Sequence, residues 1–201
     1  MKTRLFLLAL AVAVLSVAGW NVAPENFTFG SGSRVWVEGT STLHDWSCEA
    51  GQINGNIAAE PTTDRLTAIS AVTVTIPVSS IDCDNGTMNG KLRDALEGAA
   101  NVSFTLASAQ VGSVNNGIFA IRASGSLSIA GVTQTMNISA TGRALGNGRF
   151  QITGTIPFPL SQFGVDPPTA MLGTIRTRDN VTVGFDVTVQ PQVAVAAVLL
   201  D

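Results

Sequence analysis

Apolar and polar residues alternate along most of the chain beyond residue 33, with the two-residue period of a β-strand that has one dry face. In the clearest stretch, residues 66–78, most even positions are apolar, and Thr67, Thr73 and Thr75 hold odd positions. These 13 residues span roughly 40 Å at about 3.3 Å each, and a usual strand has only about five or six residues. A strand of this length indicates a tall, strongly bent sheet or a barrel.

Alternation elsewhere predicts seven more strands, over residues 34–40, 46–58, 102–106, 119–129, 136–141, 150–158 and 181–189. Between the last two, residues 161–179 contain two prolines and two glycines, which predict a long irregular loop. The apolar side chains of Phe163, Met171 and Leu172 lead us to expect that this loop packs over an apolar surface.

One segment changes period and predicts a helix. Between residues 84 and 98, Met88, Leu92 and Leu96 recur every four residues, charged residues separate them, and Gly98 is placed to end the helix. We expect this short amphipathic helix to cover an open end of the sheet. A partner-binding helix is the alternative.

The strand count fits two architectures, a sandwich and a closed barrel. Successive long hairpins with a single capping helix favour the barrel, because closure removes exposed strand edges. We therefore predict an all-β fold, an eight-stranded antiparallel β-barrel with one short capping helix. Eight strands leave room for side chains or one slim ligand, and small inward residues such as Ala123, Gly125, Ala140 and Gly154 favour some free space.

The two ends of the chain differ from this pattern. Residues 1–19 have two basic residues, an apolar run and small residues, as an export signal does, and the run falls short of the ~20 residues of a membrane anchor. Residues 20–33 are predicted to be an exposed lead-in. Residues 34–190 form the barrel domain, and residues 191–201 are an apolar tail that extends the last strand or covers a neighbouring surface.

Composition and charge restrict the partners and the compartment. Removing residues 1–19 leaves nine basic against 14 acidic residues, a net charge of about −5, which disfavours nucleic acid. Export would expose Cys48 and Cys83 to an oxidising compartment, so we expect a disulfide, with two free thiols as the alternative. If residues 59–64 form a simple turn, Cys48 lies opposite about Thr75, and Cys83 reaches it only if the chain folds back after Val78.

Several stretches, taken in order, resemble the YceI-like family of exported, lipocalin-like polyisoprenoid-binding proteins. They are residues 41–48 (STLHDWSC), 76–78 (IPV), 88–92 (MNGKL), 127–133 (LSIAGVT), 163–169 (FGVDPPT) and the strand at 181–189. The resemblance covers about residues 34–190. It implies a lipocalin-like antiparallel barrel with an elongated apolar cavity for a long isoprenoid or similar lipid chain, in a periplasmic or secreted protein. It transfers no active site.

The candidate ligand-binding residues are the larger inward side chains of the predicted strands. They are Val72, Val74, Ile76, Phe104, Leu106, Phe119, Ile121, Leu127, Met136, Ile138, Phe150, Ile152, Ile156, Phe158, Val183 and Phe185. His44 and Trp46 are placed at the cavity mouth. Periodicity does not distinguish a lined cavity from a packed core, so an ordinary filled core is the alternative.

Chemistry at His44, the single histidine, is the other hypothesis. On an extended segment neighbouring side chains point to opposite faces, so Asp45 is poorly placed to orient His44 for catalysis. A metal site built from His44, the two cysteines, Asp82 and Asp84 is a weaker interpretation, because export favours oxidised cysteines. We therefore expect that the protein is not an enzyme and that it binds no metal ion and no cofactor.

Two functions remain open. The first is a non-enzymatic binding protein that holds a polyisoprenoid, an isoprenoid quinone or a related lipid for transport, storage or sequestration, with peripheral membrane encounters for ligand exchange. The second is an envelope structural or interaction protein with a filled β core. The oligomeric state is open, a dimer included.

Overall fold

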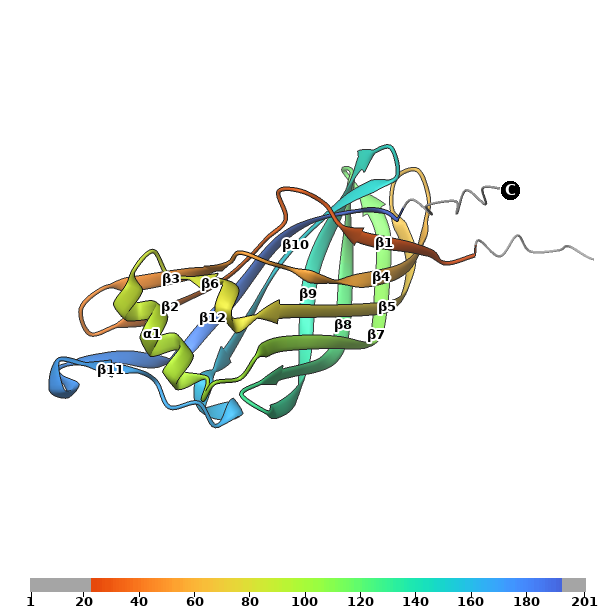
Figure 1. The fold of residues 1–201 in the computed structure, drawn as a ribbon. Coiled ribbons are helices and arrows are strands. Elements are labelled where there is room, and N and C mark those ends of the chain that lie inside the picture. The colour runs from red at the N-terminus through yellow and green to blue at the C-terminus, as the bar shows by residue number, and fades with distance from the viewer. Residues whose placement is uncertain (1–22, 193–201) are drawn as a thin grey trace, which may run out of the picture.

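The barrel wall is built from antiparallel strands that pair in chain order (Figure 1). The structure, a computed structural model, describes residues 23–192. Its strands are β1 (Glu25–Phe29), β2 (Arg34–Ser41), β3 (Asp45–Ala50), β4 (Asn54–Pro61), β5 (Leu66–Pro77), β6 (Ile81–Asp82), β7 (Asn101–Asn115), β8 (Ile118–Ile129), β9 (Val132–Gly146), β10 (Arg149–Pro159), β11 (Thr169–Ala170) and β12 (Ile175–Pro191). The helices are α1 (Gly86–Ala95) and the 3₁₀ turns η1 (Val78–Ser80), η2 (Leu160–Phe163) and η3 (Met171–Gly173).

The ring has eight strand positions. Each of three positions is occupied by two strands that follow one another, because the chain bends and interrupts the strand there. β1 and β2 follow one another along β12, β4 and β3 lie along β1 and β2, and β5 and β6 lie along β4 and β3. β7, β8, β9, β10 and β12 complete the order, and β1 closes the ring through pairs such as Phe29 with Val189. The predicted eight-stranded antiparallel barrel with one short helix is confirmed.

Two expectations about irregular segments were wrong. The lead-in at residues 20–33 contains β1, and Phe27 of β1 is fully buried, so this segment is a closing strand and not an exposed lead. The loop at residues 161–179 is shorter than predicted, because β12 already begins at Ile175. Phe163 in this loop is buried as expected, whereas Leu172 is fully exposed. The side chain of Met171, residues 1–19 and the tail from residue 193 lie outside the described part of the chain.

The interior has an apolar cluster toward each end of the barrel. At the end that carries the β7–β8 and β9–β10 turns, Phe150 makes edge-to-face contacts with Phe27 and Phe119, at ring-centroid distances of 6.2 and 6.3 Å. All three rings are at most 1% exposed, so they close this end. At the opposite end, Phe158 and Phe163 pack at 5.2 Å in a second cluster.

The helix α1 begins at a side-chain cap and lies across this opposite end (Figure 1). The side chain of Asn85 accepts hydrogen bonds from the backbone N–H groups of Thr87 and Met88, at 3.0 and 3.1 Å. No residue within α1 is buried, and Leu96, at its C-terminal cap, packs into the second cluster. The helix therefore covers the barrel end without filling it, as the predicted capping role requires.

Glycines opposite aromatic rings let those rings lie flat along the barrel wall. A Cβ atom at Gly125 in β8 would come within 2.4 Å of the Phe104 ring and 2.6 Å of the backbone oxygen of Thr105. We expect Gly125→Ala to lower the free energy of unfolding by about 1–3 kcal/mol, because backbone and ring must both move. Urea unfolding measures this.

Gly112→Ala in the neighbouring strand β7 is the matched control for this substitution. A Cβ atom there meets its nearest neighbour at 3.5 Å, which is ordinary contact. Equal effects of the two substitutions would contradict the close approach at Gly125.

Candidate ligand-binding cavity

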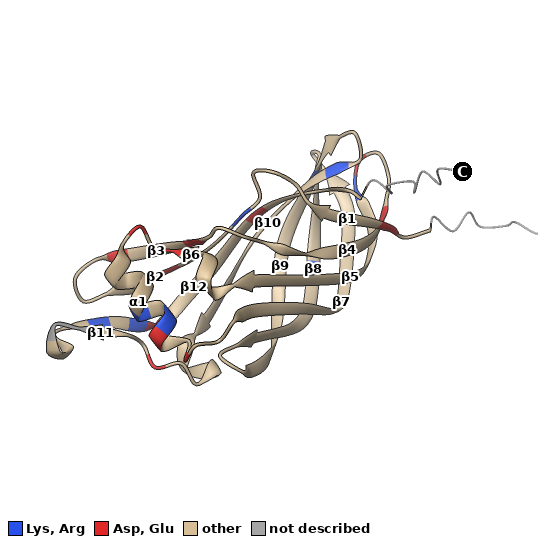
Figure 2. Ribbon diagram, viewed as in Figure 1, with Lys and Arg blue, Asp and Glu red and all other residues tan. Residues whose placement is uncertain are grey.

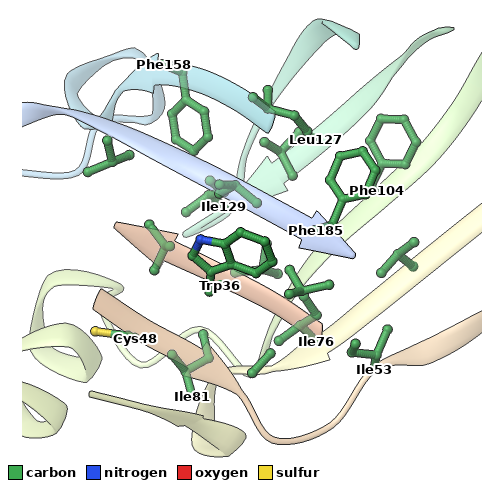
Figure 3. Close-up of a pocket in the computed structure, with 18 of the residues that line it drawn as sticks. Trp36, Cys48, Ile53, Ile76, Ile81, Phe104, Leu127, Ile129, Phe158 and Phe185 are labelled. Carbon is green, nitrogen blue, oxygen red and sulfur yellow. The ribbon is translucent and has the colours of Figure 1, made fainter. Parts of the chain in front are cut away.

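A cavity of about 570 Å³ lies inside the barrel and is bordered almost entirely by apolar side chains (Figure 3). Its walls come from every strand position of the ring and from α1. The volume is within the range of about 300–1,000 Å³ that is typical of small-molecule sites. The barrel is therefore hollow, and residues of both apolar clusters border its free space.

The cavity is closed at one end and open at the other. The rings of Phe27, Phe119 and Phe150 do not border it, and they fill the barrel beyond it. At the α1 end, its border includes exposed residues from three segments: the β2–β3 corner, the N-terminal half of α1 and the connection from β10 to β12. The cavity therefore reaches the surface at the α1 end.

The structure brings together 13 of the 16 predicted lining residues at this cavity. Those that border it are Val72, Val74, Ile76, Phe104, Leu106, Ile121, Leu127, Ile138, Ile152, Ile156, Phe158, Val183 and Phe185. The other three, Phe119, Met136 and Phe150, are buried in the apolar clusters and do not border it. That the 13 contact a ligand stays a prediction.

The two predicted mouth residues, His44 and Trp46, both border the cavity. His44 is exposed, and its Nδ1 lies 2.6 Å from the backbone carbonyl oxygen of Asp45, a contact that leaves the Asp45 carboxylate unused. The Trp46 ring lies over Gly39, and its buried Nε1–H has no acceptor among the described residues. Within residues 23–192, the Trp46 indole is therefore the one buried side-chain donor without an acceptor, and it lies beside the apolar space.

Sequence reasoning missed the contribution of the helix to the cavity. Met88, Leu92 and Leu96, which made the predicted apolar stripe, border the cavity together with Lys91. The four-residue period was the signal for this role, because a stripe on a capping helix faces the space that the helix covers.

The disulfide lies at the base of the mouth and fixes the start of α1. Cys48 and Cys83 are bonded, and both border the cavity. A simple turn at residues 59–64 would have placed Cys48 opposite Thr75, but the hairpin turn is centred on residues 62–65. Pairing of Glu49 with Asp82 then places Cys48 directly opposite Cys83.

Hydrogen bonds add to this attachment of α1. The backbone N–H of Cys83 donates to Asn89 Oδ1 at 2.8 Å, and Asn89 Nδ2 donates to Asp82 Oδ1 at 2.7 Å. The bond from Asn89, followed by the backbone N–H of Asp84, holds the pKa of Asp82 below its ordinary value. The charged form of Asp82 therefore stabilises the connection that leads into the helix.

Ionic chemistry is sparse around the cavity. Within residues 23–192, no cluster of three or more His, Cys, Asp and Glu side chains is arranged to hold a metal ion. The one ion pair in that range joins Arg34 to Glu49 at 2.7 Å on the outer surface, where such pairs contribute little. In the same part of the chain, no helix has both the length and the apolar composition needed to span a membrane.

The sequence of the chain matches the model of a known protein family. The model of the YceI-like domain matches residues 20–193. The chain belongs to the YceI-like domain family. The resemblance seen in its sequence is thereby confirmed, and a search of curated proteins gave no match.

Solved structures share the fold of this YceI-like chain at low sequence identity. BcnA from Burkholderia cenocepacia superposes with a TM-score of 0.61 at 17% identity, covering 78% of this chain and 95% of its own. A polyisoprenoid-binding domain from Saccharophagus degradans gives 0.62 at 14%, covering 86% and 100%. The Campylobacter jejuni YCEI protein gives 0.54 at 15%, covering 96% and 94%. At these identities the likeness concerns the fold alone.

Proposed function

We propose that this YceI-like chain is a non-enzymatic binding protein that holds the apolar chain of a polyisoprenoid, an isoprenoid quinone or a related lipid inside the barrel. The observation that carries the proposal is the apolar cavity of about 570 Å³, open at the α1 end and closed by phenylalanines at the other. A fold shared with a polyisoprenoid-binding domain supports the ligand class.

The lining provides affinity through apolar burial and offers few polar contacts. Each methylene removed from water contributes about 0.8 kcal/mol, so a long chain binds without specific hydrogen bonds. The polar groups near the mouth, such as His44, Lys91 and the Trp46 indole, would select the head of the ligand. We infer that the protein transports, stores or sequesters its ligand.

Export to the periplasm or the exterior is part of the proposal. The export signal predicted at residues 1–19 and the Cys48–Cys83 bond support it, because disulfides persist in oxidising compartments. The alternative of an envelope protein with a filled core is disfavoured by the volume of the cavity.

Mass spectrometry of organic extracts tests the ligand class. Protein purified from its native source without detergent is expected to release close to one equivalent of a lipid with a long apolar chain. A protein that releases no lipid, and that also fails to take up added isoprenoid quinone, would overturn the proposal. A variant with a filled cavity, described in the Discussion, is the control for lipid that adheres to the outer surface.

A further inference from the structure

Two leucines project into solvent from neighbouring loops at the cavity mouth. Among the side chains that the structure describes, five large apolar ones are exposed, and the two most exposed are Leu43, at 66%, and Leu172, which is fully exposed. Leu43 lies in the β2–β3 corner and borders the cavity, and Leu172 lies in η3 at the tip between β11 and β12.

Hydrogen bonds hold the two loops side by side. The backbone N–H of Thr42 donates to the carbonyl oxygen of Arg176 at 3.0 Å, and the backbone N–H of Arg176 donates to Thr42 Oγ1 at 3.1 Å. Thr42 Oγ1 also donates to the carbonyl oxygen of Thr174 at 3.3 Å. The two loops that carry the leucines are therefore joined into one rim.

The backbone of Leu172 is in a conformation that leucine rarely adopts. Its φ of 55° and ψ of 37° are left-handed. This conformation is unfavourable for most residues, and glycine, asparagine and aspartate are the residues that adopt it most readily. Burial does not compensate, because the side chain is fully exposed. An unfavourable backbone that presents an apolar side chain to water is the kind of feature found at binding surfaces.

Basic side chains accompany the leucines. Arg176 and Arg178 are exposed on β12 directly after the tip, and Arg176 Nε donates to the carbonyl oxygen of Gly173 at 2.9 Å. Asp45 is the one carboxylate in residues 41–45 and 169–178, so these two segments carry a net charge of +1, although Asp179 follows the second segment directly and Asp166 precedes it. Figure 2 shows basic positions of β12 and α1 at this end, with acidic positions on α1, at β3 and in the loop that leads to β11 among them.

We propose that Leu43, Leu172, Arg176 and Arg178 form a docking rim that places the cavity mouth on an anionic phospholipid surface. Leucines that enter the headgroup region, with arginines beside the lipid phosphates, are the arrangement by which proteins bind at membrane interfaces. This proposal rests on the proposed lipid-binding function, because docking there lets an apolar chain move between bilayer and barrel without crossing water.

Vesicle co-sedimentation with the full chain tests the rim. We expect binding to phosphatidylglycerol-containing vesicles to exceed binding to pure phosphatidylcholine vesicles and to fall with added salt. Leu172→Asn should weaken binding several-fold, and Leu43→Ser combined with Leu172→Asn should weaken it about tenfold or more. Ile118→Asn is the matched control, since Ile118 is 49% exposed at the opposite end of the barrel.

Leu172→Asn also separates docking from folding. Asparagine tolerates the left-handed backbone, so this variant should be at least as stable as the parent chain while it loses vesicle binding. Leu172 does not border the cavity, so uptake of a dansyl-labelled fatty acid in vesicle-free solution should be unchanged.

Three results would overturn the docking rim. They are a parent chain that ignores both vesicle types, vesicle binding that survives the double substitution, and equal loss in Ile118→Asn. If the parent chain takes up the fatty acid in solution but ignores vesicles, the rim fails and the lipid-binding function stands. If it binds vesicles through the rim but takes up no apolar ligand, the proposed function fails.

Discussion

Removing the Cys48–Cys83 bond is expected to lower the free energy of unfolding by about 4 kcal/mol. The bond joins residues separated by 35 positions. In the chain-entropy model, removing such a cross-link raises the conformational entropy of the unfolded chain, which stabilises the unfolded state by about 4 kcal/mol. We expect this loss in Cys48→Ala/Cys83→Ala, and it amounts to a quarter or more of an ordinary domain stability of about 5–15 kcal/mol. Urea unfolding followed by tryptophan fluorescence measures it.

Reduction of the parent chain is the control for this prediction. Because Cys48 and Cys83 are the two cysteines of the chain, a reductant should shift the parent transition to that of the double variant and leave the variant unchanged. A variant as stable as the oxidised parent would contradict the prediction and show that the registers of β3 and β6 hold this region without the bond.

Hydrophobic periodicity predicted the barrel because a closed antiparallel ring needs little beyond alternation and short turns. The predictions failed where the alternating stretch is short, or where the pairing of a strand depends on residues far from it in the sequence. β1 has five residues, of which Phe27 is the one buried side chain, so its pattern is too brief to be recognised. The Cys48–Cys83 bond was expected, but the strand register that brings the two residues together was not, because it depends on where the turn at residues 62–65 falls and on the bends near Gly51 and Val78.

The sequence predicted which side chains of the candidate site point into the barrel, but not how far along the barrel each one lies. Alternation showed correctly that Phe104, Phe119 and Phe150 point inward. It did not show how far each residue lies from the end of the barrel. Phe119 and Phe150 each follow a turn within a few residues and so close the end, whereas Phe104 borders open space. Depth is a property of all the registers together, which a single strand does not encode.

The mouth was the least predictable part, since three distant segments create it. The β2–β3 corner, α1 and the β10–β12 connection meet there only because the ring closes. Leu172 is fully exposed and has a left-handed backbone, although the sequence carries leucine there and not glycine or asparagine. Local propensity therefore favoured a packed side chain, and the fold overrode it.

Filling the cavity at Ala123 should abolish most uptake of long apolar ligands. Ala123 lies in the middle of β8, borders the cavity and pairs with Ala109 and Ile138 on the adjacent strands. A tryptophan there occupies space that a ligand chain would otherwise fill. If it displaces about three methylenes, affinity falls by about 2.4 kcal/mol, or roughly fiftyfold. Titration of Ala123→Trp with a dansyl-labelled fatty acid measures the loss.

Ala120→Trp supplies the matched control on the same strand. Ala120 is exposed, lies on the outer face of β8 and pairs with Thr141, so an indole there adds apolar surface without entering the barrel. We expect this variant to bind the ligand as the parent does, and Ala123→Trp to stay folded because its indole enters apolar free space. Equal uptake by both variants would contradict binding inside the barrel, and equal loss would mean that the added bulk distorts β8. If only Ala123→Trp loses ligand uptake, and its urea midpoint is unchanged, the ligand binds inside the barrel. That result would exclude a barrel whose free volume holds no ligand.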